Sequence, residues 1–316
     1  MKRVLVTGAA GFIGGQTLLN LAEQGYEVMG VDRQVPSKSL LDATPSWLTG
    51  DFATEVGLES IKSYNPDAII HCAGTSLVGP SVNDPREYYE NNYVKTKHMV
   101  DFLIDNKLTP KIIFSSSAAT YGEPIMVPCQ ESDPAAPISP YGESKLMVEW
   151  LLTGYAKAYG INAVMFRYFN ACGADHQARH GQANNATHII ARVLESIKAG
   201  KDFTLYGTSY PTEDGTCIRD YIHVEDIASA HIRALENDVP SGVYNIGTNK
   251  GISNLNIVKT AARITGKDVG ILQGAERTGD PAMLTADAGK FHKLTNWQPK
   301  YNLDDMIRHA WAWYNV

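Results

Sequence analysis

Three glycines within the first fourteen residues constrain the fold more than any other feature of this sequence. The stretch GAAGFIG, residues 8–14, directly follows the apolar run RVLVT and opens a segment of helical length, residues 12–24. In such a place one glycine makes a tight turn, a second lets the backbone approach a pyrophosphate, and a third lets the helix pack on the strand. The phosphates then lie at the helix N-terminus, where free N–H groups point at them. A glycine-rich turn alone is weak evidence, but the strand–turn–helix context predicts a dinucleotide site.

Apolar runs of strand length alternate with helical stretches along the first half of the chain. Strands are expected at residues 3–7, 27–32, 68–73, 111–115 and 163–168, with helices at 12–24, about 85–105 and from about 142. The runs are continuously apolar, which is typical of parallel strands covered on both faces. This repetition predicts an α/β fold built on a doubly wound parallel (Rossmann) sheet.

The pattern loosens after about residue 170. Residues 176–186 and 206–215 are polar and turn-rich, and helices are expected at 187–199, 224–237, 254–266 and 303–314. We therefore expect a dinucleotide-binding domain at residues 1–170 and a smaller C-terminal α/β substrate lobe at 171–316, with some segments crossing between them. The smaller lobe is expected to cover the carboxyl ends of the strands, where ligands bind in such sheets.

Composition excludes several classes of function. The chain has 316 residues, 44% apolar and 20% charged, which suits a globular protein with a sizeable core. A net charge of −6 gives no support for nucleic-acid or membrane-surface binding. No stretch approaches the ~18 uncharged apolar residues of a membrane span, and the apolar run at the N-terminus is too interrupted for a signal peptide. Four scattered cysteines without ligand-like spacing predict reduced thiols in a cytoplasmic protein and no metal site.

Asp32, at the end of the second expected strand, favours NAD over NADP. A carboxylate there accepts hydrogen bonds from the adenosine ribose hydroxyls and repels a 2′-phosphate. Arg33 is an opposing feature, because an arginine can pair with a phosphate. The alternative for Asp32 is a solvated strand end. Asp51, which closes a later strand in TGDF, is a candidate adenine contact.

SPYGESK, residues 139–145, places Tyr141 and Lys145 four residues apart. One interpretation is a surface helix capped by Ser139 with both side chains in solvent. The i, i+4 spacing also puts both side chains on one helix face. A tyrosine with a pKa near ~10 is a poor base at neutral pH, but a nearby ammonium and a positively charged nicotinamide favour its phenolate. The tyrosine could then take a proton from a substrate hydroxyl, and the serines of FSSSAATYG, 114–122, would face the same crevice.

Several motifs together resemble the extended short-chain dehydrogenase/reductase family, and within it the UDP-galactose (UDP-glucose) 4-epimerases. The resemblance extends from residue 3 to about residue 300. It rests on TGxxGFIG, SSS-A-x-x-YG, SPYGxSK, RYFNxxGA, YPTEDGTxxRDYIHVxD and R-x-GDPA. The stretches VGPSVNDPREYYENN, 78–92, and YPTEDGTCIRDYIHVED, 210–226, are the most specific to the subfamily.

Carried over by position, the resemblance implies a role for each matching residue. Tyr141 would be the acid/base, Lys145 would hold and charge it, and Ser117 would be its hydroxyl partner. NAD would be held by Gly8, Gly11, Phe12, Ile13, Gly14, Asp32, Asp51, Phe52, Ala73, Gly74, Asn91, Tyr141, Lys145 and Tyr168. The UDP-sugar substrate would be held by Ser117, Asn170, Asn185, Arg219, Arg277 and Asp280. Arg219 and Arg277 suit a diphosphate clamp, although each alone would also fit a surface ion pair.

The resemblance implies epimerisation at C4 of a UDP-hexose through a transient 4-keto intermediate, with NAD regenerated in each cycle. Related dehydratases and a decarboxylase have carboxylates directly after the active-site hydroxyl, where this chain has Ala118 and Ala119. The GDP-fucose-type epimerase/reductases need a cysteine–histidine pair, and SSSAATYG holds no cysteine. Elimination and decarboxylation are therefore disfavoured.

The identity of the sugar stays open at the level of sequence. Ser76 stands where many such epimerases have a lysine near the cofactor, and the loop before Asn185 is short. Leu284 aligns with the position that closes the sugar pocket, and its intermediate size decides nothing between plain and N-acetylated sugars. UDP-N-acetylhexosamines, UDP-pentoses and uronates are the close alternatives, and a non-catalytic NAD-binding regulator is the remote one. The resemblance also implies a homodimer formed by the helices near 85–105 and 142–158.

Overall fold

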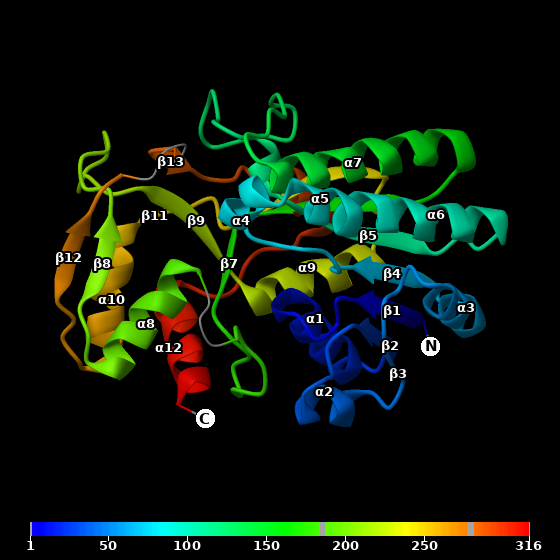
Figure 1. Ribbon diagram of the computed structural model, residues 1–316, viewed down its shortest axis with the longest axis horizontal. Helices are drawn as coiled ribbons and strands as arrows, with labels where there is room; N and C mark the ends of the chain where they lie inside the picture. Colours follow the sequence, from blue (N-terminus) through cyan, green and yellow to red (C-terminus); the bar gives the residue numbers. More distant parts are fainter. Residues whose placement is uncertain (1, 184–186, 277–280, 316) are drawn as a thin grey trace.

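A parallel sheet forms the centre of the larger lobe (Figure 1). The computed structural model describes residues 2–183, 187–276 and 281–315, and within them this sheet has seven strands in the order β10-β6-β5-β4-β1-β2-β3. The strands are β1 (Arg3–Thr7), β2 (Glu27–Asp32), β3 (Trp47–Thr49), β4 (Ala68–His71), β5 (Lys111–Ser117), β6 (Ala163–Tyr168) and β10 (Gly242–Ile246). Consecutive crossovers run outward in both directions from β1, so the predicted doubly wound parallel sheet is confirmed.

Helices cover both faces of this sheet. One face packs against α1 (Phe12–Glu23), α2 (Lys38–Ala43), α9 (Val224–Glu236) and α11 (Gly289–Thr295). The other packs against α3 (Glu55–Tyr64), α6 (Lys95–Asp105) and α7 (Pro140–Tyr159). Along β1, Val4 and Val6 enter the first core while Leu5 enters the second. The strands are apolar throughout because successive side chains face two buried layers.

The segment expected as one helix over 85–105 is divided. It consists of α5 (Pro85–Tyr88), a π-helical segment (Tyr89–Val94) and α6, and a further short helix, α4 (Val78–Asn83), precedes it. Asp84 separates α4 from α5 and accepts a hydrogen bond from the Glu87 amide at 3.2 Å. Within the described residues, no helix combines the length and the apolar character that a membrane span requires.

The smaller lobe contains short strands that the sequence patterns did not indicate. β9 (Ile218–His223) pairs with β7 (Asn170–Cys172), β11 (Gly251–Ser253) and β13 (Met283–Leu284), and β8 (Phe203–Tyr206) pairs with β12 (Ile271–Gly274). The helices α8 (Ile189–Ala199), α10 (Asn254–Thr265) and α12 (Leu303–Tyr314) pack around them, on the left of Figure 1.

The chain returns to the large sheet after it has entered the smaller lobe. β10 pairs in parallel with β6, with Gly242 opposite Val164, and forms the edge of the large sheet. α9 lies beside α1 below the sheet in Figure 1, and Ile227, Ala230 and Ala234 of α9 belong to the same core as Leu18 and Leu21 of α1. Residues beyond 170 thus build part of both lobes.

Candidate active site

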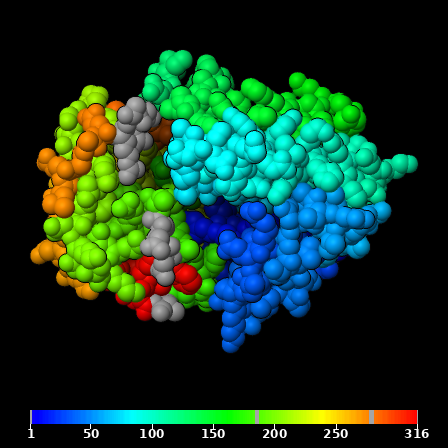
Figure 2. Space-filling model, in the orientation of Figure 1, coloured from blue at the N-terminus to red at the C-terminus, as the bar shows by residue number. Residues whose placement is uncertain are grey.

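A cleft of about 740 Å³ opens where the carboxyl ends of the central strands meet the smaller lobe. In Figure 2, the N-terminal residues, in dark blue, lie at the floor of a hollow between the two lobes. Many residues singled out from the sequence line this cleft, namely Gly8, Gly11, Phe12, Ile13, Gly14, Gly74, Ser117, Tyr141, Lys145, Tyr168, Asn170 and Arg219. They come from far apart in the sequence, and the sheet topology brings them to one edge.

The glycine turn leaves room for a dinucleotide because side chains cannot occupy it. Gly8 has a φ of +68°, and a Cβ there would lie 2.6 Å from the Ala73 nitrogen. A Cβ on Gly14 would lie 2.1 Å from the Gly8 carbonyl oxygen. The turn therefore needs glycine at both positions, one for its left-handed backbone and one for the close approach of helix to strand.

The first turn of α1 presents backbone donors to the cleft. Gly11 is the N-cap and offers no side chain to the first amides, and Phe12, Ile13 and Gly14 line the cleft. Unpaired amides at a helix N-terminus bind phosphate well. The Asp32 carboxylate is hydrogen-bonded to the turn. Its Oδ2 accepts from the Ala10 amide at 2.9 Å, and its Oδ1 accepts from the Gln34 amide at 2.8 Å. This donor set and the glycine cradle fit NAD.

The start of α7 places Tyr141 and Lys145 in the cleft. Ser139 caps the helix by accepting from the Gly142 amide at 3.2 Å, and Pro140 occupies the first turn. Lys145 is only 5% exposed, and its Nζ donates to the Ser115 carbonyl at 2.8 Å. The same Nζ lies 5.9 Å from the centre of the Tyr141 ring. The capped helix start is present, but this face of it is buried in the protein instead of lying in solvent.

Burial shifts both members of the pair toward their neutral forms. It lowers the pKa of Lys145 to about 8, because a buried ammonium loses hydration. It raises the pKa of Tyr141, while the hydrogen bond with Ser117 opposes that rise. At neutral pH Tyr141 is therefore a phenol beside an ammonium that keeps most of its charge. A further positive charge in the cleft would lower the pKa of this phenol.

Tyr168 is held by a chain of hydrogen bonds that the sequence patterns did not indicate. Its hydroxyl bonds to Nε2 of the buried His231, whose Nδ1 lies 3.0 Å from Oγ1 of Thr17. The Thr17 hydroxyl in turn donates to the Ile13 carbonyl at 2.8 Å. Burial lowers the pKa of His231 to about 3, so this ring is neutral. The chain ties Tyr168 on β6 to the first turns of α1.

Five of the predicted cofactor contacts stand outside the lining of the cleft. They are Asp32, Asp51, Phe52, Ala73 and Asn91. Asp51 instead forms an ion pair with Lys95 at 2.6 Å, and the same Nζ donates to Asn91 at 2.9 Å. Asn91 also donates to Thr75, a residue that does line the cleft. Asp51 and Asn91 are thus joined through Lys95, and Asn91 holds the lining residue Thr75.

The smaller lobe contributes polar groups to the opposite wall. Asn170 donates to the Asp220 carbonyl at 3.2 Å, and Arg219 donates to the Ile218 carbonyl at 2.9 Å. Ser76 and Leu284, noted from the sequence, also line the cleft. The predictions for Asn185, Arg277 and Asp280 fall outside the described residues.

Sequence reasoning missed several lining residues, including Cys72, Gln182, His188 and Arg192, whereas Ser115 and Ser116 line the cleft as expected. Arg192 lies on α8 and adds a second guanidinium to the lining of the cleft that contains Arg219. Its signal in the sequence is weak, because an arginine in an amphipathic helix is ordinarily a solvated residue. Cys72 directly follows β4, and burial raises the pKa of its thiol to about 12.

The comparisons with known proteins agree with this geometry over the whole chain. The model of the NAD dependent epimerase/dehydratase family matches residues 4–247. The chain is 41% identical to the UDP-glucose 4-epimerase of Halalkalibacterium halodurans, over 98% of this chain and 95% of that protein. The structure of UDP-glucose 4-epimerase from Brucella ovis in complex with NAD matches with a TM-score of 0.93 at 39% identity, covering 99% of this chain and 98% of that one.

The UDP-Glc/GlcNAc 4-epimerase of Campylobacter jejuni matches with a TM-score of 0.86 at 35% identity, covering 100% of this chain and 99% of that one. The glycine turn, the pairing of Tyr141 with the buried Lys145 and these full-length similarities lead to one assignment. The chain belongs to the NAD dependent epimerase/dehydratase family.

Proposed function

We propose that this protein interconverts UDP-glucose and UDP-galactose by inverting C4 of the sugar, with NAD as its cofactor. One observation carries the proposal: a single cleft is lined by the glycine turn, by Ser117, Tyr141 and Lys145, and by Arg219 of the smaller lobe. A dinucleotide cradle, an acid/base and a cation suited to a diphosphate thus face the same space. The relatives named above as UDP-glucose 4-epimerases support this substrate class.

The chemistry divides between the cofactor and the side chains. NAD, when bound, supplies the carbon that accepts a hydride from the sugar and returns it. Tyr141 takes the proton from the 4-hydroxyl and gives it back after the sugar has turned over. Ser117 orients the same oxygen by hydrogen bonding. Lys145, held by the Ser115 carbonyl, keeps a positive charge near the phenol and favours its ionised form.

The nucleotide part of the substrate must stay bound while the keto sugar presents its other face. Arg219 and Arg192 are suited to the diphosphate, because guanidinium groups pair with phosphate oxygens in a fixed geometry. Asn170, at the start of β7, lines the same cleft. Asn185, Arg277 and Asp280 remain predicted members of this set.

The lining of the cleft favours epimerisation over elimination. Among the described residues that line it there is no aspartate or glutamate, and Ala118 and Ala119 follow Ser117 directly. Removal of water from C5 and C6 requires a second acid/base pair near those carbons. With no carboxylate in the described lining, the oxidised sugar is expected to return to a hexose on one face or the other.

A direct test is interconversion of UDP-galactose and UDP-glucose, read by coupling to UDP-glucose dehydrogenase. Tyr141→Phe should fold and bind NAD but lose at least ~10²-fold in kcat, because it removes the acid/base. Tyr155→Phe is the matched control on the same helix; it removes only a bond to Asp101 at 2.7 Å. Full activity of Tyr141→Phe would remove that residue from the mechanism, and failure to convert any UDP-sugar would overturn the enzyme assignment.

UDP-N-acetylhexosamines are the second candidate substrates. Leu284 lines the cleft and is partly buried, and the similar Campylobacter jejuni protein is named for both UDP-Glc and UDP-GlcNAc. A comparison of kcat/KM across UDP-glucose, UDP-N-acetylglucosamine, a UDP-pentose and a UDP-uronate separates these possibilities. A preference above ~10-fold for the N-acetylated sugar would replace the first proposal with the second.

We further propose that the protein is a cytoplasmic homodimer formed through α6 and α7. Three large apolar side chains on or next to these helices are exposed, Val94 by 44%, Trp150 by 66% and Tyr159 by 58%, and contact with a second copy would bury them. The four cysteines are free, which suits a reducing compartment. Light scattering at micromolar concentration tests the assembly, and a mass of one chain would contradict it.

A further inference from the structure

Gly15 follows the glycine turn but does not belong to it. A Cβ on Gly15 would lie 2.6 Å from both Cε1 and Nε2 of His180, a residue 165 positions later in the chain. Real Cβ atoms do not approach so closely, so a side chain at position 15 would displace the imidazole. The absence of a side chain at Gly15 therefore leaves the space that the His180 imidazole occupies.

The His180 ring is buried against the first turn of α1. Its Nε2 lies 3.2 Å from the Gly11 carbonyl oxygen and 3.1 Å from the Phe12 carbonyl oxygen. Both partners are acceptors, so Nε2 carries the proton and donates to them. Gly11 already accepts from the Gly15 amide at 2.8 Å, so His180 adds a second donor to the turn that presents its amides to the cleft.

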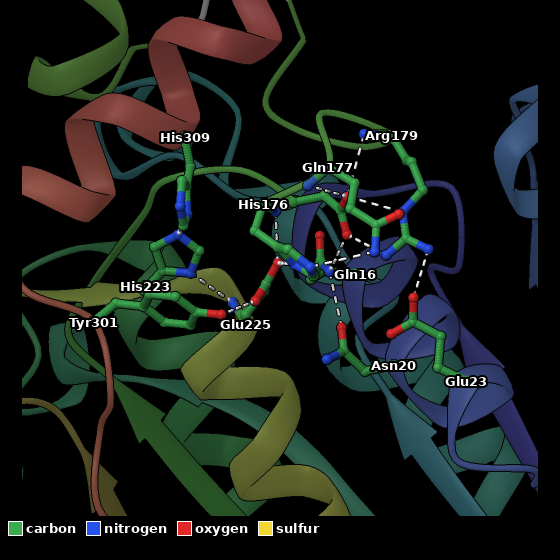
Figure 3. A network of polar contacts seen from close by, with 11 residues as sticks. Gln16, Asn20, Glu23, His176, Gln177, Arg179, His223, Glu225, Tyr301 and His309 are labelled. Atoms are coloured by element: carbon green, nitrogen blue, oxygen red, sulfur yellow. Dashed lines mark hydrogen bonds and ion pairs between the residues drawn. The ribbon is translucent and has the colours of Figure 1, made fainter.

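The loop that carries His180 is fastened along the rest of α1 as well. Asp175 Oδ2 accepts from Gln16 at 3.0 Å and from Arg179 at 2.6 Å, and Arg179 Nη1 donates to Glu23 at 2.5 Å. Figure 3 shows Arg179 beside Glu23, with Gln16 nearby. Contacts thus run from the first residues of α1 to its last residue.

The same loop is also held by α9 and by α12 of the smaller lobe. The backbone amide and Nδ1 of His176 both lie 2.7 Å from Glu225 Oε1. Two residues after His180, the Gln182 carbonyl accepts from Trp313 Nε1 on α12 at 2.8 Å, while Gln182 itself lines the cleft. The loop therefore joins the wall on the substrate side to the back of the dinucleotide turn.

We propose that His180 is a positioning residue that holds the dinucleotide turn in its phosphate-binding geometry through its two bonds to Gly11 and Phe12. The inference rests on the proposed role of this turn in binding NAD. Fixing the two carbonyls orients the peptide planes of the first turn, and the amides that face the pyrophosphate belong to those planes. His180 itself does not line the cleft.

The test compares NAD affinity across variants of the full chain stripped of nucleotide. The glutamine amide nitrogen can reach the place of Nε2, whereas the shorter asparagine cannot. His180→Gln should bind NAD within ~2-fold of the wild type, and His180→Asn and His180→Ala should bind about 5- to 20-fold more weakly, as the loss of two hydrogen bonds predicts. Titration calorimetry gives the dissociation constants, and the melting temperature of each stripped variant reports its folding separately.

His292→Leu is the matched control. His292 lies on α11, outside the cofactor turn, and its Nδ1 donates to the Trp297 carbonyl at 2.9 Å. The substitution should leave NAD affinity unchanged. If the wild type binds NAD and His180→Gln and His180→Asn bind it with equal affinity, the role proposed for His180 is wrong, while the proposed function stands. A wild-type chain that binds no NAD would overturn the proposed function together with this role.

The close contact between Gly15 and His180 allows a second experiment. Gly15→Ala should weaken NAD binding about 10-fold in the wild type, because the new methyl group pushes the imidazole off its carbonyl partners. In the His180→Ala background the imidazole is gone, and the new Cβ meets only the Ala9 carbonyl oxygen, at 3.2 Å, among the close contacts. There the same substitution should change NAD affinity by less than ~2-fold. Equal effects of Gly15→Ala in both backgrounds would refute the pairing.

Discussion

A buried ion pair behind the active site gives the sharpest test of the packing between α7 and the sheet. Arg167 of β6 donates from Nε to Glu149 Oε1 at 2.9 Å and from Nη2 to Glu149 Oε2 at 2.6 Å, and the two side chains are only 5% and 3% exposed. Ser116, next to Ser117, donates to the same carboxylate at 2.6 Å. The ion pair thus links α7, which carries Tyr141, to β6, and the Ser116 bond links α7 to the end of β5, which carries Ser117.

Removal of one partner of the Arg167–Glu149 pair should lower the free energy of unfolding much more than removal of both partners. Arg167→Met leaves Glu149 buried without its cation, and breaking such a pair costs about 3–5 kcal/mol. The double variant Glu149→Met/Arg167→Met replaces both charges by apolar groups of similar length, for which the net cost is often near zero. We therefore expect the double variant to be more stable than Arg167→Met by at least ~2 kcal/mol.

Urea unfolding, followed in parallel by circular dichroism and tryptophan fluorescence, measures these differences. The control is Arg263→Met, which breaks an equally short pair with Asp304, 2.6 Å, whose side chains are 60% and 39% exposed. An exposed pair of this kind contributes less than about 1 kcal/mol. The reasoning is refuted if Arg167→Met costs no more than Arg263→Met, or if the double variant loses the sum of its two single losses.

The cofactor turn, the acid/base pair and the loop behind them each give one further prediction. Gly14→Ala should weaken NAD binding by at least ~10-fold in calorimetry, because its Cβ would lie 2.1 Å from the Gly8 oxygen; unchanged binding would show that the turn has another conformation. Lys145→Met should lower kcat at least ~10-fold at pH 7 and recover part of it in alkaline solution, as the pH approaches the raised pKa of Tyr141 and the phenol ionises unaided; a flat pH profile would exclude an electrostatic role for Lys145. Although burial acts to raise the pKa of Asp175, hydrogen bonds from Arg179 and Gln16 lower it to about 2, below its unfolded value of 3.8, so its contribution is present above pH 4 and lost as the pH falls toward 2. Asp175→Asn should therefore cost about 2 kcal/mol at pH 7 in urea unfolding and less as the pH falls toward 2, and an equal cost at both ends would contradict the assigned pKa.

Local patterns indicated five of the seven strands of the central sheet, β1, β2, β4, β5 and β6, because each carries its own signal, whereas they gave no bounds for β3 and did not indicate β10. β1 and β2 have the predicted bounds, 3–7 and 27–32, and β6 has the predicted bounds 163–168. A strand covered on both faces must be apolar at every position, so the sequence shows it without reference to its neighbours. The glycine turn is equally local, because the left-handed backbone at Gly8 and the close contact at Gly14 admit no other residue without strain.

Other parts of the fold depended on partners distant in the sequence. β7, β11 and β13 have only two or three residues each, and they exist because β9 offers hydrogen bonds on either side. Such strands are too short to show a period of two. The expected helix over 85–105 is interrupted at the π-helical segment 89–94, where Asn92 bonds to Ser144 of α7 and to the Thr75 carbonyl. These tertiary bonds outweigh the regular helical pattern that the residues themselves favour.

By itself, the sequence determined the parallel sheet, the dinucleotide turn and the four-residue spacing of Tyr141 and Lys145, since each is a short-range property of the chain. Only the tertiary structure decided that Lys145 is buried against the Ser115 carbonyl, that Arg192 enters the cleft, and that His180 lies behind the glycine turn. These outcomes depend on which surfaces the crossovers bring together. No local pattern encodes them, because burial and pairing through space are properties of the complete fold.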